Sequence, residues 1–284
     1  MKLYFLGKSN NFGYAINADI FNHLYRQKVT RTKFYNAEYA AIGSILGKFF
    51  YNHNESNWSR QNLKRRFYGQ VFRNQPVTIL GSGIIEDLTA IASQLSLYRP
   101  LNLRLLRGEK TKKIMQIVTG EDLGDVPLGD PGLLVRNLFD SSNIAKKYRL
   151  GIIPHYADFR SPFLDGYRKD PDVTVIDIKS EAASFMRSVN ECEMIASSSL
   201  HGLVVADSFA IPAVWIRLSN ALTGGEFKFL DYFSAINVKR ICHDLRENRN
   251  SLQKMDIQVT EEVDQDHLSN VIENMDKVIK EVLH

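Results

Sequence analysis

Short apolar runs alternate along the chain with longer segments whose apolar residues recur every three or four positions. The runs predict buried strands at residues 3–6, 77–80, 101–106, 149–153, 173–178, 194–196 and 213–216. The periodic segments predict helices with one apolar face at residues 15–25, 181–193 and 261–283, and the apolar run at residues 203–210 also has helical character. Strands that alternate with helices in this way are typical of an α/β fold with a mostly parallel sheet.

Two stretches fit this pattern less closely. Residues 40–47 are small and apolar and predict a further strand and turn, whereas residues 48–75 are rich in Asn, Arg and aromatic side chains. We interpret residues 48–75 as a helix and loop segment at the surface or at the rim of a substrate site. Aromatic side chains interleaved with polar ones suit sugar binding, and they also suit an ordinary packed loop.

The length of 284 residues suits two domains of ordinary size or one large domain. Residues 129–134 hold Gly, Asp and Pro at short spacing, and we place the crossover between domains soon after this turn. The division gives residues 1–140 and residues 141–284. The apolar stripe of the terminal helix is expected to dock on the core, because its polar face lacks the Lys and Arg of a membrane-surface helix.

The composition, with 44% hydrophobic and 24% charged residues, is that of an ordinary globular protein. No apolar run is as long as a transmembrane helix, and the first residues lack the apolar core and cleavage site of a signal peptide. Cys192 and Cys242 fit a reducing compartment and have no metal-ligand spacing. We therefore expect a cytoplasmic protein, at the inner face of the membrane if it meets one, with no metal or other cofactor.

The formal charge of +4 is too small for a typical nucleic-acid-binding protein. The basic residues nevertheless fall into three groups, which are Arg60, Lys64, Arg65, Arg66 and Arg73; Lys110, Lys112 and Lys113; and Lys146, Lys147 and Arg149. Such groups are most often solvated surface. The alternative is that they attract an anionic substrate or make a peripheral contact with an anionic membrane.

Three serines and a histidine surround the start of one predicted helix. Ser197, Ser198 and Ser199 follow the strand at residues 194–196, and His201 comes directly before the apolar helical segment. A helix N-terminus has free N–H groups and a partial positive charge, so this loop is a candidate site for a phosphate or carboxylate. The alternative is that one serine caps the helix, but a cap needs a single hydroxyl and no imidazole.

Further candidates lie where predicted strands end, because open α/β sheets bind ligands beyond the carboxyl ends of their strands. Asn11 and Ser82 belong to turns, which give each of them a structural explanation as well. Arg107 either aims its guanidinium at an anion or lies at the surface. His155 follows the strand at residues 149–153 and is either a ligand of the substrate or a structural histidine.

A dense cluster of aromatic and charged residues follows the two glycines at 224 and 225. In this cluster, Lys228, Asp231 and Tyr232 either reach a substrate or pack a helix against the interface between the domains. Asp158, close behind His155 in the chain, is a further acidic candidate.

Taken in order, these segments resemble the polysaccharide pyruvyl transferase family over roughly residues 1–238. The matching motifs are Asn11-Phe12-Gly13, Gly43-Ser44-Ile45-Leu46, Gly81-Ser82-Gly83, Arg107-Gly108, Gly129-Asp130-Pro131-Gly132-Leu133-Leu134, Gly151-Ile152-Ile153-Pro154-His155-Tyr156, Ser198-Ser199-Leu200-His201-Gly202, and Phe227-Lys228-Phe229 with Asp231-Tyr232. The chain departs from the family pattern at Ser199, where many members have Arg, and at Tyr14, where many have an acidic residue.

The resemblance implies two Rossmann-like domains that face a cleft, as in GT-B glycosyltransferases. It implies phosphoenolpyruvate as the donor and a hydroxyl pair of a polysaccharide or lipid-linked oligosaccharide as the acceptor, on which a pyruvate ketal forms. Residues 1–140 would then hold the acceptor, and residues 141–284 would hold the donor.

For this chemistry we assign His201 as a donor ligand and general acid, and His155 as the base or a second ligand. Asp158 is a reserve base. Arg107 or Lys228 has to supply the cation that the family places at position 199. The expected donor-binding residues are Ser198, Ser199, Leu200, Arg107 and Lys228. The residues expected on the acceptor side or in the cleft are Asn11, Ser82, Asp158 and Asp231.

Two other functions remain open at this point. A GT-B glycosyltransferase that uses a nucleotide sugar could hold a diphosphate with the glycine turn at residues 81–83 and the serine loop. A non-catalytic protein that binds glycans or anions is the third possibility, because Ser199 replaces the family arginine.

Overall fold

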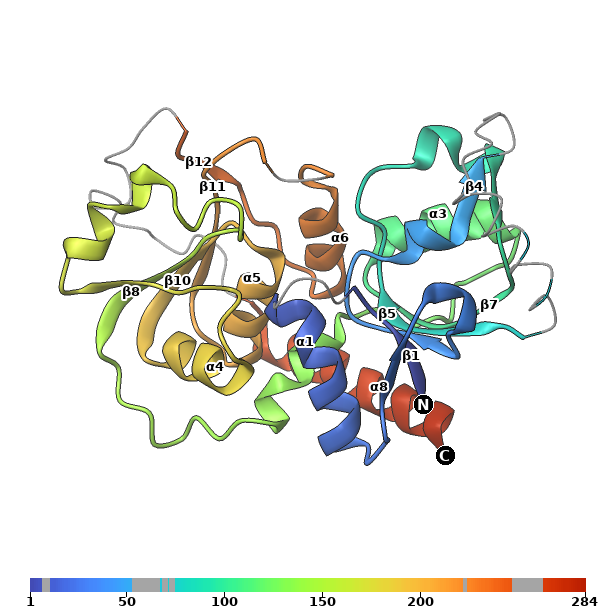
Figure 1. Cartoon of the computed structure of the whole chain (residues 1–284), viewed down its shortest axis with the longest axis horizontal. Coiled ribbons are helices and arrows are strands. Elements are labelled where there is room, and N and C mark those ends of the chain that lie inside the picture. Colours follow the sequence, from blue (N-terminus) through green and yellow to red (C-terminus); the bar gives the residue numbers. More distant parts are fainter. Residues whose placement is uncertain (7–10, 53–66, 68–70, 72–74, 222–223, 247–262) are drawn as a thin grey trace.

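The computed structural model describes residues 1–6, 11–52, 67, 71, 75–221, 224–246 and 263–284. These residues form two parallel sheets of five strands each, one in each half of the molecule (Figure 1). The first sheet contains β1 (Lys2–Tyr4), β2 (Thr30–Thr32), β3 (Tyr39–Ala40), β5 (Val77–Ser82) and β7 (Leu101–Leu106). The second sheet contains β8 (Tyr148–Ile153), β9 (Val173–Val175), β10 (Cys192–Ser197), β11 (Ala213–Arg217) and β12 (His243–Asp244). The predicted α/β fold with two Rossmann-like domains is confirmed.

Both sheets have the same strand order. The first runs β2-β1-β3-β5-β7, and the second, read from its β9 edge, runs β9-β8-β10-β11-β12. In each sheet the order reverses beside the first strand, between β1 and β3 and between β8 and β10. The loops that leave two such neighbouring strands run to opposite faces of the sheet, and ligands of open α/β folds bind in the crevice between them. The topology therefore marks two ligand positions, one in each half.

Helices cover the sheets and join them. They are α1 (Phe12–Asp19, continued by a π-helical turn, Ile20–Leu24), α3 (Glu109–Thr119), α4 (Ala182–Asn190), α5 (Leu200–Ser208), α6 (Phe227–Ala235) and α8 (Gln265–Leu283). Short 3₁₀ segments lie at Phe34–Asn36, Leu46–Phe49, Thr89–Gln94, Pro131–Asn137, Pro162–Leu164 and Tyr167–Lys169. A small antiparallel ribbon pairs β4 (Phe50–Asn52) with β6 (Leu95–Leu97).

The two halves share one apolar core. Helix α1 follows the first strand of the first sheet but packs against α4 and the Pro131–Asn137 segment. Helix α8 comes from the end of the chain and returns to β7 of the first sheet (Figure 1). The largest core cluster consequently contains Leu3 from the first sheet, Ile153 from the second and Met275 from α8, all without exposed surface.

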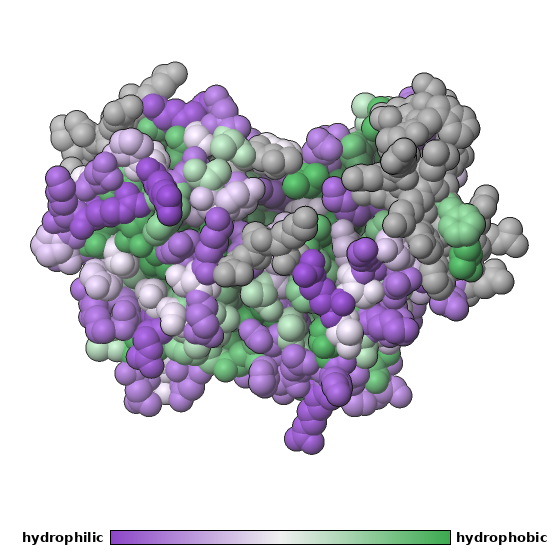
Figure 2. All heavy atoms as spheres, in the orientation of Figure 1, coloured by the Kyte–Doolittle hydropathy of each residue, from purple (hydrophilic) through white to green (hydrophobic). Residues whose placement is uncertain are grey.

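Helices α3 and α6 make a close contact between the halves. The N-cap of α3 is Gly108, and a Cβ at this position would lie 1.7 Å from the carbonyl oxygen of Asp231 in α6. The backbone N–H of Glu109 donates to the hydroxyl of Ser234 at 2.9 Å. Around these contacts the molecule has two lobes, and its surface is hollowed between them (Figure 2).

Several boundaries differ from those predicted. Helix α1 begins at Phe12 and not at residue 15, because Asn11 caps it, and α5 begins at Leu200 and not at residue 203. Strand β2 was not predicted, because its Thr-Arg-Thr sequence has no apolar residue. The C-terminal helix is confirmed, at Gln265–Leu283. Of the predicted helix and loop segment at residues 48–75, the first residues lead into β4, and nearly all of the rest lies outside the described residues. None of the described helices is both long and apolar enough to cross a membrane.

Candidate active site

The serine loop lies at the strand-order reversal of the second sheet, between β10 and α5. The buried hydroxyl of Ser197 donates to the carbonyl oxygens of Ile153 and Ser199 and accepts the N–H of Ser199. The hydroxyl of Ser198 accepts the backbone N–H of His155 at 2.8 Å, which joins the loops after β8 and β10. Ser199 is the N-cap of α5, but its side chain makes no capping hydrogen bond. Simple helix capping therefore does not explain why three serines are present.

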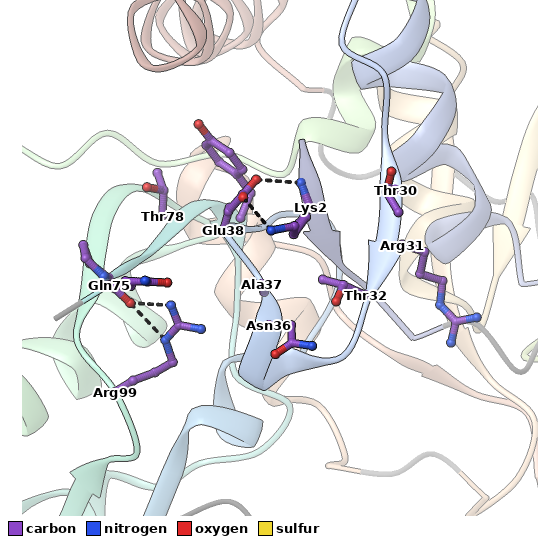
Figure 3. A pocket seen from close by; sticks show the side chains of 12 residues that line it. Lys2, Thr30, Arg31, Thr32, Asn36, Ala37, Glu38, Gln75, Thr78 and Arg99 are labelled. Atoms are coloured by element: carbon purple, nitrogen blue, oxygen red, sulfur yellow. Dashed lines mark hydrogen bonds and ion pairs between the residues drawn. The ribbon is translucent and has the colours of Figure 1, made fainter. Parts of the chain in front are cut away.

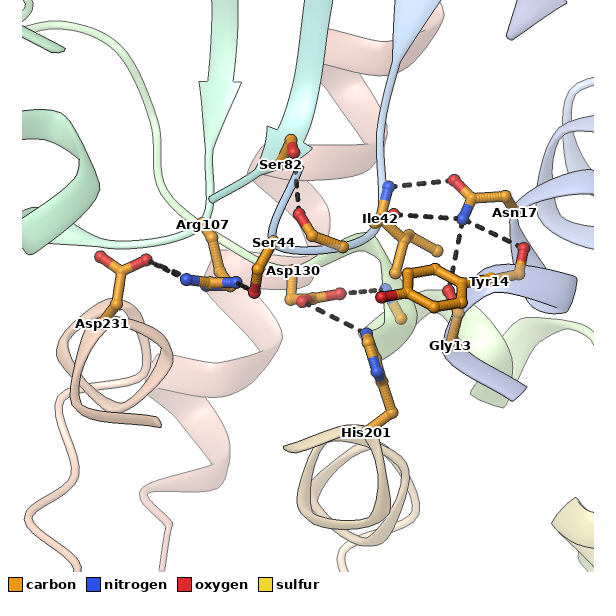
Figure 4. A network of polar contacts seen from close by, with 12 residues as sticks. Gly13, Tyr14, Asn17, Ile42, Ser44, Ser82, Arg107, Asp130, His201 and Asp231 are labelled. Atoms are coloured by element: carbon orange, nitrogen blue, oxygen red, sulfur yellow. Dashed lines mark hydrogen bonds and ion pairs between the residues drawn. The ribbon is translucent and has the colours of Figure 1, made fainter. Parts of the chain in front are cut away.

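His201 stands in the first turn of α5, with 12% of its side chain exposed. Its ring packs against Gly13 of α1, where a Cβ would lie 2.0 Å from Nδ1. Its Nε2 lies 3.9 Å from Oδ2 of the fully buried Asp130 (Figure 4). Burial lowers the pKa of His201, Asp130 opposes this effect, and the positive charges of Arg107 and Lys228 add to it. The imidazole is therefore fixed in position and neutral in the free protein.

His155 and Lys228 complete, with His201, a group of three basic side chains around the serine loop. Burial, together with the charges of Lys228 and Lys179, lowers the pKa of His155 to about 4. The Nδ1 atom of His155 accepts the N–H of Ala157 at 3.4 Å, which leaves Nε2 as the other functional atom. Burial also lowers the pKa of Lys228 to about 8, with a smaller contribution from Arg107. These shifts all disfavour positive charge, so an anion placed here would relieve them.

Arg107 does not face this group as an open cation. Its side chain has no exposed surface, and its guanidinium donates to Asp231 at 2.9 Å and to Ser44 at 2.6 Å (Figure 4). It also donates to the carbonyl of Ile84 at 2.6 Å. Asp231 is equally buried and also accepts the N–H and hydroxyl of Thr111. The pair joins the end of β7 to α6, so both residues hold the two halves together. The ammonium of Lys228 lies 5.3 Å from the ring centroid of Phe229 and makes no ion pair within the described residues, so it is the candidate cation left for a ligand.

The candidates on the first sheet hold its loops. Asn11 caps α1 by accepting the N–H of Gly13 at 3.1 Å, and the buried Ser82 donates to the carbonyl of Gly43 at 2.8 Å. Asn17, which the sequence interpretation omitted, joins α1 to the next loop by donating to the carbonyl of Ile42 and accepting its N–H. These bonds fix the loops at the strand-order reversal of the first sheet.

Two buried carboxylates have an oxygen without a hydrogen-bond partner among the described residues. Oδ1 of Asp130 accepts the N–H of Gly132, as expected for a turn, but its Oδ2 faces His201 without a bond. Asp158 donates its own N–H to the carbonyl of His155, and its Oδ2 is also unpartnered. An unpartnered buried oxygen is costly in a folded protein and is common where a ligand or a proton is handled.

Three lysines of the basic groups noted in the sequence are engaged by the protein itself. Lys112 donates to the carbonyls of Gly124 and Val126, Lys146 donates to that of Cys192, and Lys147 pairs with Glu191. The group that begins at Arg60 lies outside the described residues.

A separate cavity of about 610 Å³ lies at the amino ends of strands in the first sheet (Figure 3). It contains the ion pair of Lys2 with Glu38 and the bonds from Arg99 to Gln75. Open α/β sheets bind substrates at the opposite ends of their strands, so the serine loop, and not this cavity, is the candidate active site.

Comparison with known proteins identifies the family of the chain. A family model described as polysaccharide pyruvyl transferase matches residues 14–220, which include both sheets except for β1 and β12 and contain His155 and His201. The chain belongs to the polysaccharide pyruvyl transferase family. Lys228 and Asn11 lie outside the matched range, and Ser199 lies inside it.

Two curated relatives are similar to this pyruvyl transferase family member over part of their length. Uncharacterized protein L143 of Acanthamoeba polyphaga mimivirus is 32% identical over 171 residues, which cover 59% of this chain and 57% of the relative. Succinoglycan biosynthesis protein ExoV of Rhizobium meliloti (strain 1021) is 25% identical over 137 residues, which cover 48% of this chain and 41% of the relative. The chain thus spans about half the length of these relatives. No solved structure matches it.

Sequence interpretation of this family member missed two parts of the site. Asp130 was assigned to a turn, and its second oxygen became visible as a neighbour of His201 once the fold brought the segments together. Gly13 was noted only as a glycine of a motif. The structure explains why glycine is needed there, because the imidazole of His201 occupies the space that a side chain would fill. The segments that contain Gly13 and Asp130 both follow the end of a strand. This position was the signal in the sequence that could have marked both residues as part of the site.

Proposed function

We propose that this pyruvyl transferase family member transfers the enolpyruvyl group of phosphoenolpyruvate to two hydroxyls of a glycan sugar and forms a pyruvate ketal. The observation that carries the proposal is the group of His155, His201 and Lys228 around the N-terminus of α5, where burial lowers the pKa of each side chain. Phosphoenolpyruvate carries a phosphate and a carboxylate, and it would supply the negative charge that this group lacks.

Donor binding would use the serine loop and Lys228. The N-terminus of α5 offers backbone N–H groups and the positive end of its dipole. Ser198 keeps its own hydroxyl proton for donation, because it accepts the N–H of His155, and the hydroxyl of Ser199 is not used as a cap. Lys228 takes the place of the family arginine, because Arg107 is already bound to Asp231. Charge-assisted hydrogen bonds contribute roughly 1.5–3 kcal/mol each, so three or four are enough for micromolar binding.

The reaction requires one proton to be added to a carbon, two protons to be removed from hydroxyls, and two new C–O bonds at one carbon. A proton is added to the methylene carbon of the enol, and a sugar hydroxyl attacks the neighbouring carbon. Phosphate then leaves with the C–O bond electrons, and a second hydroxyl closes the ketal at the same carbon. The two hydroxyls release two protons, of which one balances the proton gained by the methylene group and the other leaves with phosphate.

The two histidines suit opposite roles in this sequence. Binding of an anionic donor would raise the pKa of His201, because it adds negative charge beside the imidazole, and Asp130 already favours the charged ring. His201 would then deliver the proton to the methylene carbon. His155, whose pKa of about 4 keeps it neutral near pH 7, would accept a hydroxyl proton. Asp158 remains a reserve for this second role.

Calorimetric titration of the purified protein with phosphoenolpyruvate tests the proposal. UDP-galactose and inorganic phosphate are titrated in parallel. Saturable binding of phosphoenolpyruvate that exceeds the affinity for phosphate is expected. Binding of UDP-galactose without binding of phosphoenolpyruvate would instead favour a glycosyltransferase that uses a nucleotide sugar.

We expect donor affinity to fall as pH rises through the pKa of Lys228. This ammonium is charged below its pKa of about 8, so above that pH the dissociation constant should rise by up to about tenfold per pH unit. Lys228→Met should weaken binding at pH 7 by about 10- to 100-fold and remove this dependence. Lys113→Met, which removes an exposed charge of α3, serves as control. Unchanged affinity of Lys228→Met would exclude Lys228 as a donor ligand.

Gly13→Ala should lower the rate of phosphate release by about 100-fold, because the added methyl group would displace the imidazole of His201. The rate is measured with phosphoenolpyruvate and a panel of sugar acceptors. Gly166→Ala is the matched control, because nothing lies within 4 Å of the added methyl group. Equal rates for the two variants would show that the contact with Gly13 does not position His201.

A further inference from the structure

Two tyrosines lie at the two strand-order reversals, one in each half of the molecule. Tyr14 lies in the first turns of α1, after β1, and Tyr156 lies in the loop after β8. Burial raises the pKa of Tyr14, and the nearby phenol of Tyr156 raises it further, which places the two rings within electrostatic reach of each other. One tyrosine therefore comes from each half of the molecule, at the ends of the sheets where ligands bind.

Tyr156 is a large ring that the protein leaves accessible beside a candidate catalytic histidine. It is 47% exposed, and its ring centroid lies 4.2 Å from that of His155. The ammonium of Lys179 lies 5.0 Å from the centroid of the same ring. An exposed aromatic side chain that contacts an active-site imidazole is placed to meet whatever approaches that imidazole.

The hydroxyls of Tyr14 and Tyr156 and the ammonium of Lys179 lack hydrogen-bond and ion-pair partners within the described part of the chain. Among the described residues, neither phenol hydroxyl makes a hydrogen bond, and Lys179 makes no ion pair. The ring of Tyr14 lies against the turn at Gly43, where a Cβ would be 3.2 Å from its Cε1. Tyr14 is thus held by the first sheet, whereas its hydroxyl remains available.

We propose that Tyr14, Tyr156 and Lys179 form the acceptor subsite and that its occupant is a sugar ring that carries a negatively charged group. The proposal rests on the proposed function, because it takes the open side of His155 as the place where a hydroxyl is deprotonated. The ring C–H groups on one face of a pyranose form an apolar surface that packs on an aromatic ring, and its hydroxyls bond to phenols.

The position of Lys179 explains the preference for an acidic or phosphorylated sugar. A cation–π contact at an exposed site contributes about 0.5–1 kcal/mol, so a sugar can displace the ammonium from the ring at low cost. The displaced ammonium then needs a new partner, and a charge-assisted hydrogen bond to a carboxylate or phosphate on the sugar is stronger than the contact it replaces. A neutral sugar would pack on the ring of Tyr156 but would not form the charge-assisted hydrogen bond with Lys179.

Binding of sugar phosphates tests the subsite without knowledge of the natural acceptor. Glucose 1-phosphate, galactose 1-phosphate, their methyl glycosides and inorganic phosphate are titrated into the full chain and followed by calorimetry and ligand-observed NMR. At least one sugar phosphate is expected to bind about tenfold more tightly than its methyl glycoside and than phosphate. Lys179→Met should abolish the advantage over the methyl glycoside.

Variants of Tyr156 distinguish the loss of ring stacking from a loss of folding. Tyr156→Ala should weaken sugar phosphate binding by about tenfold or more, and Tyr156→Phe, which keeps the ring, should stay within about threefold of the wild type. Ile241→Ala, at an exposed apolar residue elsewhere, is the matched control. A titration of Tyr156→Ala with phosphoenolpyruvate shows whether the protein remains folded and competent for the donor.

The possible outcomes are distinct. Absence of saturable binding by every sugar phosphate, or equal affinity in the wild type and Tyr156→Ala, overturns the subsite. Sugar phosphate binding that depends on Tyr156, together with no binding of phosphoenolpyruvate, supports the subsite and overturns the proposed donor. Sugar phosphate affinity equal to that of inorganic phosphate overturns the role of the sugar ring.

Discussion

Replacement of His201 by glutamine is expected to lower the turnover of phosphoenolpyruvate by about 10²- to 10⁴-fold, which is the usual contribution of a positioned general acid. Glutamine fills much of the space between Gly13 and Asp130 and cannot be protonated near neutral pH. The rate is measured as phosphate release in the presence of an acceptor panel. The dissociation constant for phosphoenolpyruvate is measured in parallel and should change far less than the turnover.

A histidine outside the site provides the control for this experiment. His23→Gln changes an exposed residue of the π-helical turn after α1 and should leave the rate unaltered. Thermal unfolding of both variants shows whether the fold is retained. A His201→Gln protein that keeps about a tenth or more of the wild-type rate would remove His201 from the proton transfer.

Asp231→Ala is expected to lower the free energy of unfolding by about 3–5 kcal/mol, because it leaves the guanidinium of Arg107 buried without a counter-charge. The variant also loses the bonds from Asp231 to the N–H and hydroxyl of Thr111 at the start of α3. Urea unfolding followed by circular dichroism measures the difference.

Two further variants show whether the ion pair itself is responsible. Lys147→Ala breaks a pair whose lysine is largely exposed and should cost about 1 kcal/mol or less. Combination of Asp231→Ala with Arg107→Met removes both buried charges and should recover part of the loss, because no unpaired ion remains. A double variant as unstable as the sum of the single variants would contradict this explanation.

Much of the fold could be predicted, because each central strand and each amphipathic helix carries its own periodic signal. The serine loop and His155 were recognised from their positions after predicted strands, and the structure places both at one strand-order reversal. The fold class and the C-terminal helix followed from the same local patterns. Edge strands such as β2 gave no signal, because a strand that borders solvent needs no apolar run.

Contacts between distant segments could not be predicted. An arginine after a strand looks the same in sequence whether it meets a ligand or a carboxylate, and Asp231 is the residue that engages Arg107. Asp130 fulfils the expectation for a turn with one oxygen and faces His201 with the other. The partners of Arg107 and Asp130 lie far away in the sequence and are brought to them by packing. Neither the residue type nor the local spacing in the sequence indicates such a partner.

The close contact of Gly108 with α6 limits how the molecule can move. Paired α/β domains that bind a ligand between them often close by rotation about a hinge. Here the touching backbones and the buried ion pair lie between the lobes, so rotation of one lobe would break contacts that stabilise the folded state. These contacts hold the two lobes at a fixed spacing. In the proposed reaction, both bonds to the ketal carbon would form in a frame of fixed dimensions. Acceptors would be sorted by whether they fit that frame, since it does not adjust to them.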